Sequence, residues 1–120
     1  MRTDTTNRPA DHEATEAKNV AWTLLSRRQS TDSNMTIAVQ RFEPGGTFAE
    51  HVHDLEQFFY VTQGQMEMTV GGSTKTYSQG DFVVVDRNEP HSGRNVSEGA
   101  SELLFVDYWP SDSEDRLGLD

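Results

Sequence analysis

The chain contains no cysteine. A protein without thiols forms no disulfides, binds no metal through thiolates and has no cysteine nucleophile. Any metal site in this chain must therefore do without thiolate ligands.

Positive charge is also scarce, with 10 Lys and Arg residues against 20 Asp and Glu residues and a net charge of -10. Such a surface repels the phosphates of nucleic acids and anionic lipid headgroups. We therefore expect neither nucleic acid nor a membrane as a partner.

Long apolar runs are missing as well, and no stretch approaches the length needed to span a membrane. The first 18 residues are polar and lack the apolar segment of a secretory signal. We expect a soluble, cytoplasmic protein whose residues 1–18 form a disordered arm, with His12 as a surface residue in that arm. At 120 residues the chain has room for one domain, which we place at residues 19–110, followed by an acidic tail over residues 111–120.

Apolar residues alternate with polar ones in short segments separated by Gly, Pro, Asn and Asp. No helical period runs longer than a turn or two, and Gly71-Gly72 is a strong hairpin signal. The pattern predicts an all-β antiparallel sandwich or barrel of about nine strands. These are expected at Val20–Leu24, Met35–Val39, Phe48–His53, Gln57–Val61, Gln65–Val70, Ser73–Tyr77, Phe82–Val85, His91–Val96 and Ser101–Trp109.

Three of the four histidines lie in two glycine-bounded segments. His51 and His53 are two residues apart, so on a strand both imidazoles leave the same face. If the two segments pair in one sheet, His91 and the amide of Gln57 can reach the same point. Neutral imidazole is a common ligand of divalent metals, so this set predicts one metal ion. The alternatives are three hydrogen-bonded histidines without a metal, and a glutamine that only bonds a neighbour.

The first segment resembles motif 1 of the cupin superfamily, which is Gly, five residues, His-x-His, three or four residues, Glu, six residues, Gly. This chain has the same spacing from Gly45 through His51 and His53 to Gly64, with Gln57 at the position of the glutamate. Glu56 stands one position earlier, but neighbouring strand positions face opposite ways, so Gln57 is the expected ligand.

The second segment resembles cupin motif 2, which is Gly, five residues, Pro-x-Gly, two residues, His, three residues, Asn. Here Gly80, His91 and Asn95 keep the spacing, while Asp86 and Asn88 replace the Pro and Gly. Asn enters left-handed backbone conformations more readily than most residues, so the turn can still form. We expect Asn95 to be a structural residue of the turn or of the ligand surroundings.

The resemblance implies a cupin-type antiparallel jelly-roll β-barrel with one divalent ion, Zn, Mn, Ni or Fe, held by His51, His53, Gln57 and His91. A neutral ligand set leaves the charge of the ion uncompensated, which favours Lewis-acid chemistry over oxygen activation. The combination of three histidines and a glutamine also resembles cupins that act as sugar isomerases in uronate breakdown and as polyketide cyclases. It implies an isomerase, lyase or cyclase acting on an oxygenated small molecule. The alternatives are a metal-dependent dioxygenase and a non-catalytic module that binds a small ligand or metal.

The chain offers further candidates around this site. Asp107 lies inside the apolar run LLFVDYW and is a weak candidate for a catalytic acid or base; the alternative is an exposed residue near a strand end. Arg41 and Arg94 could bind an anionic substrate, although surface exposure is their default interpretation. The expected apolar walls are Phe59, Val61, Met66, Met68, Phe82, Val84 and Phe105.

We also expect a homodimer, because cupins commonly pair sheet to sheet. Trp22, Tyr108 and Trp109 lie on expected outer strands and form more aromatic surface than a monomer readily exposes. Finally, Gln57→Glu is expected to keep the metal, since a carboxylate is the better donor, and to weaken its Lewis acidity.

Overall fold

The computed structural model describes residues 12–13, 21–27 and 35–113. Every regular element in these residues is a β-strand, and none of them forms a helix that could span a membrane. The strands are β1 His12–Glu13, β2 Ala21–Arg27, β3 Met35–Phe42, β4 Thr47–His51, β5 Glu56–Gln63, β6 Gln65–Val70, β7 Ser73–Ser78, β8 Phe82–Val85, β9 His91–Asn95 and β10 Ser101–Tyr108.

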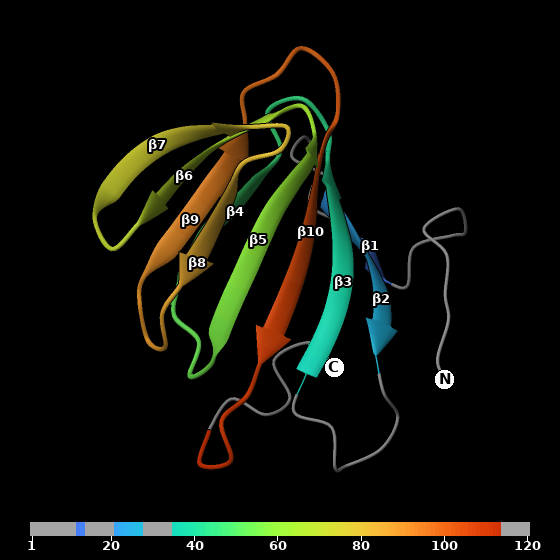
Figure 1. Cartoon of the computed structure of the whole chain (residues 1–120). Coiled ribbons are helices and arrows are strands. Elements are labelled where there is room, and N and C mark those ends of the chain that lie inside the picture. Colours follow the sequence, from blue (N-terminus) through green and yellow to red (C-terminus); the bar gives the residue numbers. More distant parts are fainter. Residues whose placement is uncertain (1–11, 14–20, 28–34, 114–120) are drawn as a thin grey trace.

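The strands form two antiparallel sheets, as Figure 1 shows. The larger sheet has the order β1-β2-β3-β10-β5-β8, and the smaller has the order β4-β9-β6-β7. From β3 to β10 the chain crosses from one sheet to the other at every step except β6 to β7, as expected of a jelly roll. The fold class predicted from the sequence is confirmed.

The core lies between the two sheets and contains inward-facing residues from both. Its fully buried members are Ala38, Phe42, Phe59, Val61, Met66, Met68, Val85, Leu103 and Phe105. Most of them come from strands whose burial alternates with period two, most clearly in β10. The alternation of apolar side chains seen in the sequence therefore becomes the inner face of each sheet.

All nine predicted strands are present, with ends shifted by up to a few residues. The tenth strand, β1, lies within the segment predicted to be a disordered arm, where His12 and Glu13 pair with Thr23 and Trp22 of β2. Backbone pairing with an open sheet edge requires no apolar side chains, so composition did not indicate it. The remainder of the arm and most of the acidic tail lie outside the described residues.

Two residues that were expected to line the walls of the site, Phe82 and Val84, are instead on the outer side of the sheet. Phe82 and Val84 are 60% and 47% exposed, whereas Val85 is buried. The run Phe82–Val85 is apolar at every position, so it has no alternation to indicate which face is inside. The pairing with β5 decides it, because Val85 lies opposite the buried Gln57.

Trp109 was expected to be part of an exposed aromatic surface, and this expectation is wrong. It is 7% exposed and therefore buried, whereas its neighbour Tyr108 is 47% exposed. Successive residues of an extended chain face opposite sides, so only one of the two aromatics could be on the outside. Trp22 belongs to β2, and its side chain is outside what the structure describes.

The turns around the two histidine segments follow the sequence prediction. Gly71 and Gly72 have φ of 57° and 83°, and they join Val70 to its partner Ser73 in a tight hairpin. Asn88 has φ of 63°, so the asparagine adopts the left-handed conformation expected of it.

Candidate metal centre

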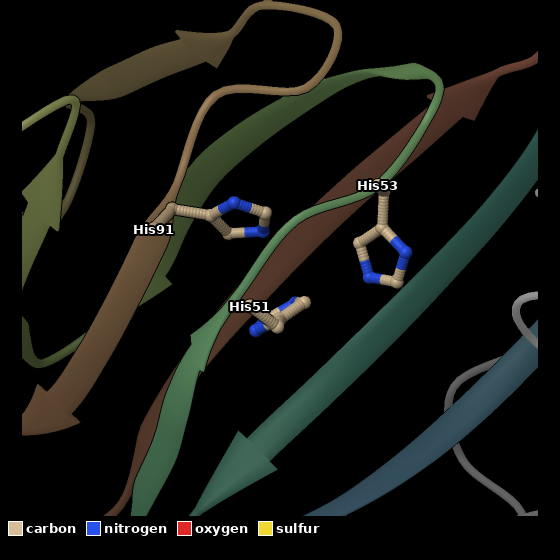
Figure 2. A group of neighbouring side chains, drawn as sticks. All are labelled: His51, His53 and His91. Atoms are coloured by element: carbon tan, nitrogen blue, oxygen red, sulfur yellow. The ribbon is translucent and has the colours of Figure 1, made fainter.

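Three histidines meet on the inside of the barrel. His51 ends β4, His53 follows in the loop, and His91 begins β9, where it is the cross-strand partner of His51. Their candidate ligand nitrogens all lie within 4.8 Å of one another. Figure 2 shows the three rings turned toward a common space. The predicted convergence of these residues is confirmed.

Backbone carbonyls fix the orientation of two of the rings. Nδ1 of His51 lies 2.7 Å from the Ala49 carbonyl oxygen, and Nδ1 of His91 lies 3.0 Å from that of Glu89. A carbonyl only accepts, so in both rings Nδ1 carries a proton, and in the neutral form of the ring Nε2 carries the lone pair. Nε2 of His91 is buried and has no hydrogen-bond partner among the described residues. A metal ion would satisfy this atom.

The protonation state of His91 also suits a metal ligand. Burial, together with the neighbouring His51 and His53, lowers its pKa from 6.5 to about 4. The imidazole is therefore neutral at physiological pH, which is the form that binds metals.

Gln57 lies on β5, opposite Asp107 of β10, and both side chains are buried. Nε2 of Gln57 donates a hydrogen bond of 2.8 Å to Oδ1 of Asp107. Oε1 of Gln57 is buried and has no hydrogen-bond partner in the described part of the chain. Gln57 lines the same cavity as His51 and His53.

A cavity of about 80 Å³ lies beside His51, His53 and Gln57. It is lined by Gln40, Phe48, His51, His53, Gln57, Phe59 and Phe105. Two of the predicted wall residues, Phe59 and Phe105, are therefore correct, and Val61, Met66 and Met68 belong to the buried core.

Gln40 and Phe48 were missed in the sequence. Gln40 shares the inner face of β3 with the buried Ala38 and Phe42. The alternation in the sequence places this polar side chain on the inner face, and that could have marked it as a site residue. The ring of Phe48 lies 5.7 Å from that of His51 and 6.2 Å from that of His91. Phe48 thus forms an aromatic wall directly beside the histidines.

Asp107 is 1% exposed, so the alternative that it is an exposed residue near a strand end is wrong. Its carboxylate contacts the amide of Gln57, and it is not among the described residues that line the cavity. A role as catalytic acid or base stays a prediction.

The loop that carries His53 is held by the loop between β8 and β9. The backbone N–H of Asn88 donates to the His53 carbonyl oxygen at 2.8 Å. The guanidinium of Arg87 forms an ion pair with both carboxylate oxygens of Asp54. Arg87 also donates to Asp112 at 3.0 Å, and these carboxylates raise the pKa of its guanidinium. This support for His53 was not predicted, because it joins residues more than 30 positions apart.

The remaining candidates are structural. The side-chain amide of Asn95 donates to the carbonyl oxygens of Phe42, Glu43 and Gly99 at 3.1, 3.1 and 2.8 Å, so it ties motif 2 to the turn that begins motif 1. Arg41 pairs with Glu102, and Arg94 pairs with Glu67. Neither arginine lines the cavity, as their default interpretation predicted.

Comparison with known proteins agrees with this geometry. Residues 38–107 match the family model described as the cupin domain, and this region includes all four candidate ligands. The chain belongs to the cupin family. The resemblance predicted from the two motifs is thereby confirmed.

One curated protein similar to this chain is a polyketide synthase. Polyketide synthase CurC of Streptomyces cyaneus is 29% identical over 77 residues, which cover 63% of this chain and 49% of that protein. The matched region is thus about half the length of that relative.

Among solved structures, a predicted oxalate decarboxylase from Thermotoga maritima has a TM-score of 0.72 at 20% identity, covering 78% of this chain and 84% of that one. KdgF from Halomonas sp. has a TM-score of 0.67 at 17% identity, covering 85% and 91%. At these identities the two structures establish the fold alone.

Proposed function

We propose that this cupin holds one divalent ion, Zn, Mn, Ni or Fe, through His51, His53, His91 and Gln57, and that it acts as an isomerase, lyase or cyclase on a small oxygenated molecule. The donor set fits a metal, because Nε2 of His91 and Oε1 of Gln57 are buried acceptors without partners among the described residues. When bound, the ion supplies Lewis acidity toward substrate oxygens.

The observation that carries the non-redox assignment is the neutrality of the donors. No carboxylate is found among the described residues that line the cavity, and Asp107 lies behind Gln57. Imidazole and amide ligands leave the charge of a divalent ion uncompensated, which strengthens Lewis acidity and disfavours higher oxidation states. The similarity to polyketide synthase CurC also supports an oxygenated small molecule as the substrate.

The side chains around the donors have separate tasks in this proposal. Phe48, Phe59 and Phe105 keep bulk water from the reacting groups. The Gln40 amide can donate to, or accept from, a substrate oxygen and so orient the molecule. The small cavity suits a compact molecule or one end of a larger one.

A binding module is the second candidate. The side chains that line the cavity are histidines, amides and phenylalanines, and if all three histidines bind the metal, none of these side chains is left to move a proton. In that case the substrate itself, or a solvent molecule, would have to serve as the acid or base. A protein that only binds an oxygenated ligand needs no such group.

Proton exchange separates these functions. We would incubate metal-free and metal-loaded protein in D₂O with a panel of small oxo acids, hydroxy acids and diketones, and follow C–H to C–D exchange by NMR and oxygen by electrode. The proposal predicts metal-dependent exchange next to a carbonyl, with no oxygen uptake, and its loss in His53→Ala. Metal-dependent oxygen uptake would instead establish the dioxygenase alternative. Ligand binding to the metal-loaded protein without exchange or oxygen uptake would establish the binding module.

A further inference from the structure

Asp107 and Gln57 belong to a buried row that crosses four strands of the larger sheet. On the inner face Thr36 of β3 lies opposite Asp107 of β10, Asp107 lies opposite Gln57 of β5, and Gln57 lies opposite Val85 of β8. All four residues are buried. The only member of this row that lines the metal cavity is Gln57, so Asp107 can act on that cavity through its neighbour.

The contact between the two residues fixes which end of the amide faces Asp107. An amide donates hydrogen bonds only through its nitrogen, and Nε2 of Gln57 is the donor to Oδ1 of Asp107. The distance of 2.8 Å from Nε2 to Oδ1 is that of a strong hydrogen bond. Oε1 is thereby turned away from Asp107 and remains a buried acceptor without a partner among the described residues.

We propose that Asp107 is a positioning residue that holds the Gln57 amide with Oε1 as the metal-facing atom, and that it makes position 57 selective for an amide over a carboxylate. This inference rests on the proposed metal centre. In this arrangement the negative charge of Asp107 contacts Gln57 and not the metal ion. The charge orients a neutral ligand and does not neutralise the ion directly.

The contact changes what is expected of Gln57→Glu. From the sequence alone this variant keeps the metal, because a carboxylate is the better donor. In the structure the new carboxylate would meet Asp107 at hydrogen-bond distance in a buried site, where like charges repel strongly. Val85, on the other side of position 57, is apolar and offers no compensating charge.

The same contact predicts a rescue. In the double variant Gln57→Glu/Asp107→Asn, the asparagine amide can donate to the new glutamate. The hydrogen bond is then restored with donor and acceptor exchanged, and the negative charge has moved to the metal side. The two substitutions are therefore expected to be strongly non-additive.

The test is a titration of each metal-free protein with Co²⁺, followed by calorimetry and by the absorption bands of the bound ion. We expect one Co²⁺ per wild-type chain, affinity lower by at least about tenfold in Gln57→Glu, and affinity within about threefold of wild type in the double variant. Asp107→Leu, which removes the acceptor, should lower affinity and shift the Co²⁺ bands. Thr36→Val changes the other neighbour of Asp107 in the row and should leave the bands unchanged.

The outcomes separate this inference from the metal centre on which it rests. A wild-type protein that takes up no Co²⁺ would overturn the metal centre itself. A wild-type protein that binds Co²⁺, with Gln57→Glu binding equally tightly or with additive losses in the double variant, would overturn only the role of Asp107. If Gln57→Glu does not fold, as judged by circular dichroism, recovery of folding and Co²⁺ binding in the double variant supports the inference, and failure of that recovery contradicts it.

Discussion

His91 is a residue whose burial has a measurable consequence for stability. Its pKa is about 4 in the folded chain and 6.5 in an ordinary environment. Between these values the unfolded chain takes up a proton that the folded chain does not, so protonation favours unfolding. The stability that comes from the neutral, buried imidazole is fully present above pH 6.5 and is lost as the pH falls toward 4.

We therefore predict that the metal-free protein loses roughly 2 kcal/mol more unfolding free energy between pH 7 and pH 4.5 than the variant His91→Gln does. The glutamine is similar in size and does not titrate, so the variant retains the acid sensitivity of the other groups. Urea denaturation in the presence of a chelator, at both pH values, measures the difference. Equal losses in the two proteins would contradict the assignment of His91 as a neutral buried group.

The sequence predicted the cluster of three histidines but not what surrounds it. The spacing of His51, His53 and His91 is a property of strand periodicity and of the two motifs, and it can be read along the chain. The contact of Gln57 with Asp107 joins residues 50 positions apart and depends on which strands become neighbours. Such cross-strand partners follow from topology, which a single sequence leaves open.

At the scale of elements, β9 leaves room for the Phe48 ring of β4 because one position on β9 has no side chain. Gly93 lies opposite Phe48, and a Cβ at Gly93 would come within 2.5 Å of the Phe48 ring and 3.3 Å of Met68. The Phe48 ring in turn packs against His51 and His91. The glycine therefore allows the aromatic wall to sit beside the proposed ligands.

Gly93→Ala should force the Phe48 ring to move and should lower the unfolding free energy by about 1–3 kcal/mol. Because the ring packs against two of the histidines, Co²⁺ affinity should fall by several-fold as well. Thermal unfolding and Co²⁺ titration measure the two effects. Gly99→Ala is the matched control, since a Cβ at Gly99 meets no atom within 4 Å. Identical behaviour of the two variants would show that this close approach does not matter.

The elements themselves were largely predictable. Alternation and turn residues located nine strands, whose ends depend on hydrogen bonds that the sequence does not specify. The side of a strand that faces the core was predictable only where polar and apolar residues alternate, as in β10. For β8, which is apolar at every position, the prediction was wrong. The pairing of β1 was missed because strands pair through backbone groups, which composition does not reveal.

Within the described residues, most exposed large apolar side chains gather on one face of the larger sheet. Most of the large apolar side chains that are exposed in the described residues lie on strands β3, β10, β5 and β8, which are neighbours in the larger sheet. They are Met35, Ile37, Tyr60, Phe82, Val84 and Tyr108. The cross-strand register places them on the side opposite the core, and we call this surface the outer face. A contiguous apolar surface of this kind is typical of an interface.

The expected homodimer stays a prediction, and the outer face is where we expect the second copy to pack. Light scattering at micromolar concentration should give twice the chain mass of 13.5 kDa. Val84→Lys introduces a charge on the outer face and should shift the mass toward that of one chain. Val96→Lys, at an exposed valine outside this face, should leave the mass unchanged. A wild-type mass near 13.5 kDa would contradict the dimer.

The most direct test of the account is the metal content of the protein, because the fold, the two motifs and the buried acceptors all converge on one ion. Elemental analysis of protein purified without added metal, and again after loading with Co²⁺ and dialysis, gives the number of ions per chain. We predict about one ion per wild-type chain, and loss of most of it in His53→Ala while circular dichroism still shows a folded sheet. A wild-type chain that retains no ion in either preparation, or full retention of the ion in a folded His53→Ala variant, would contradict the proposed metal centre.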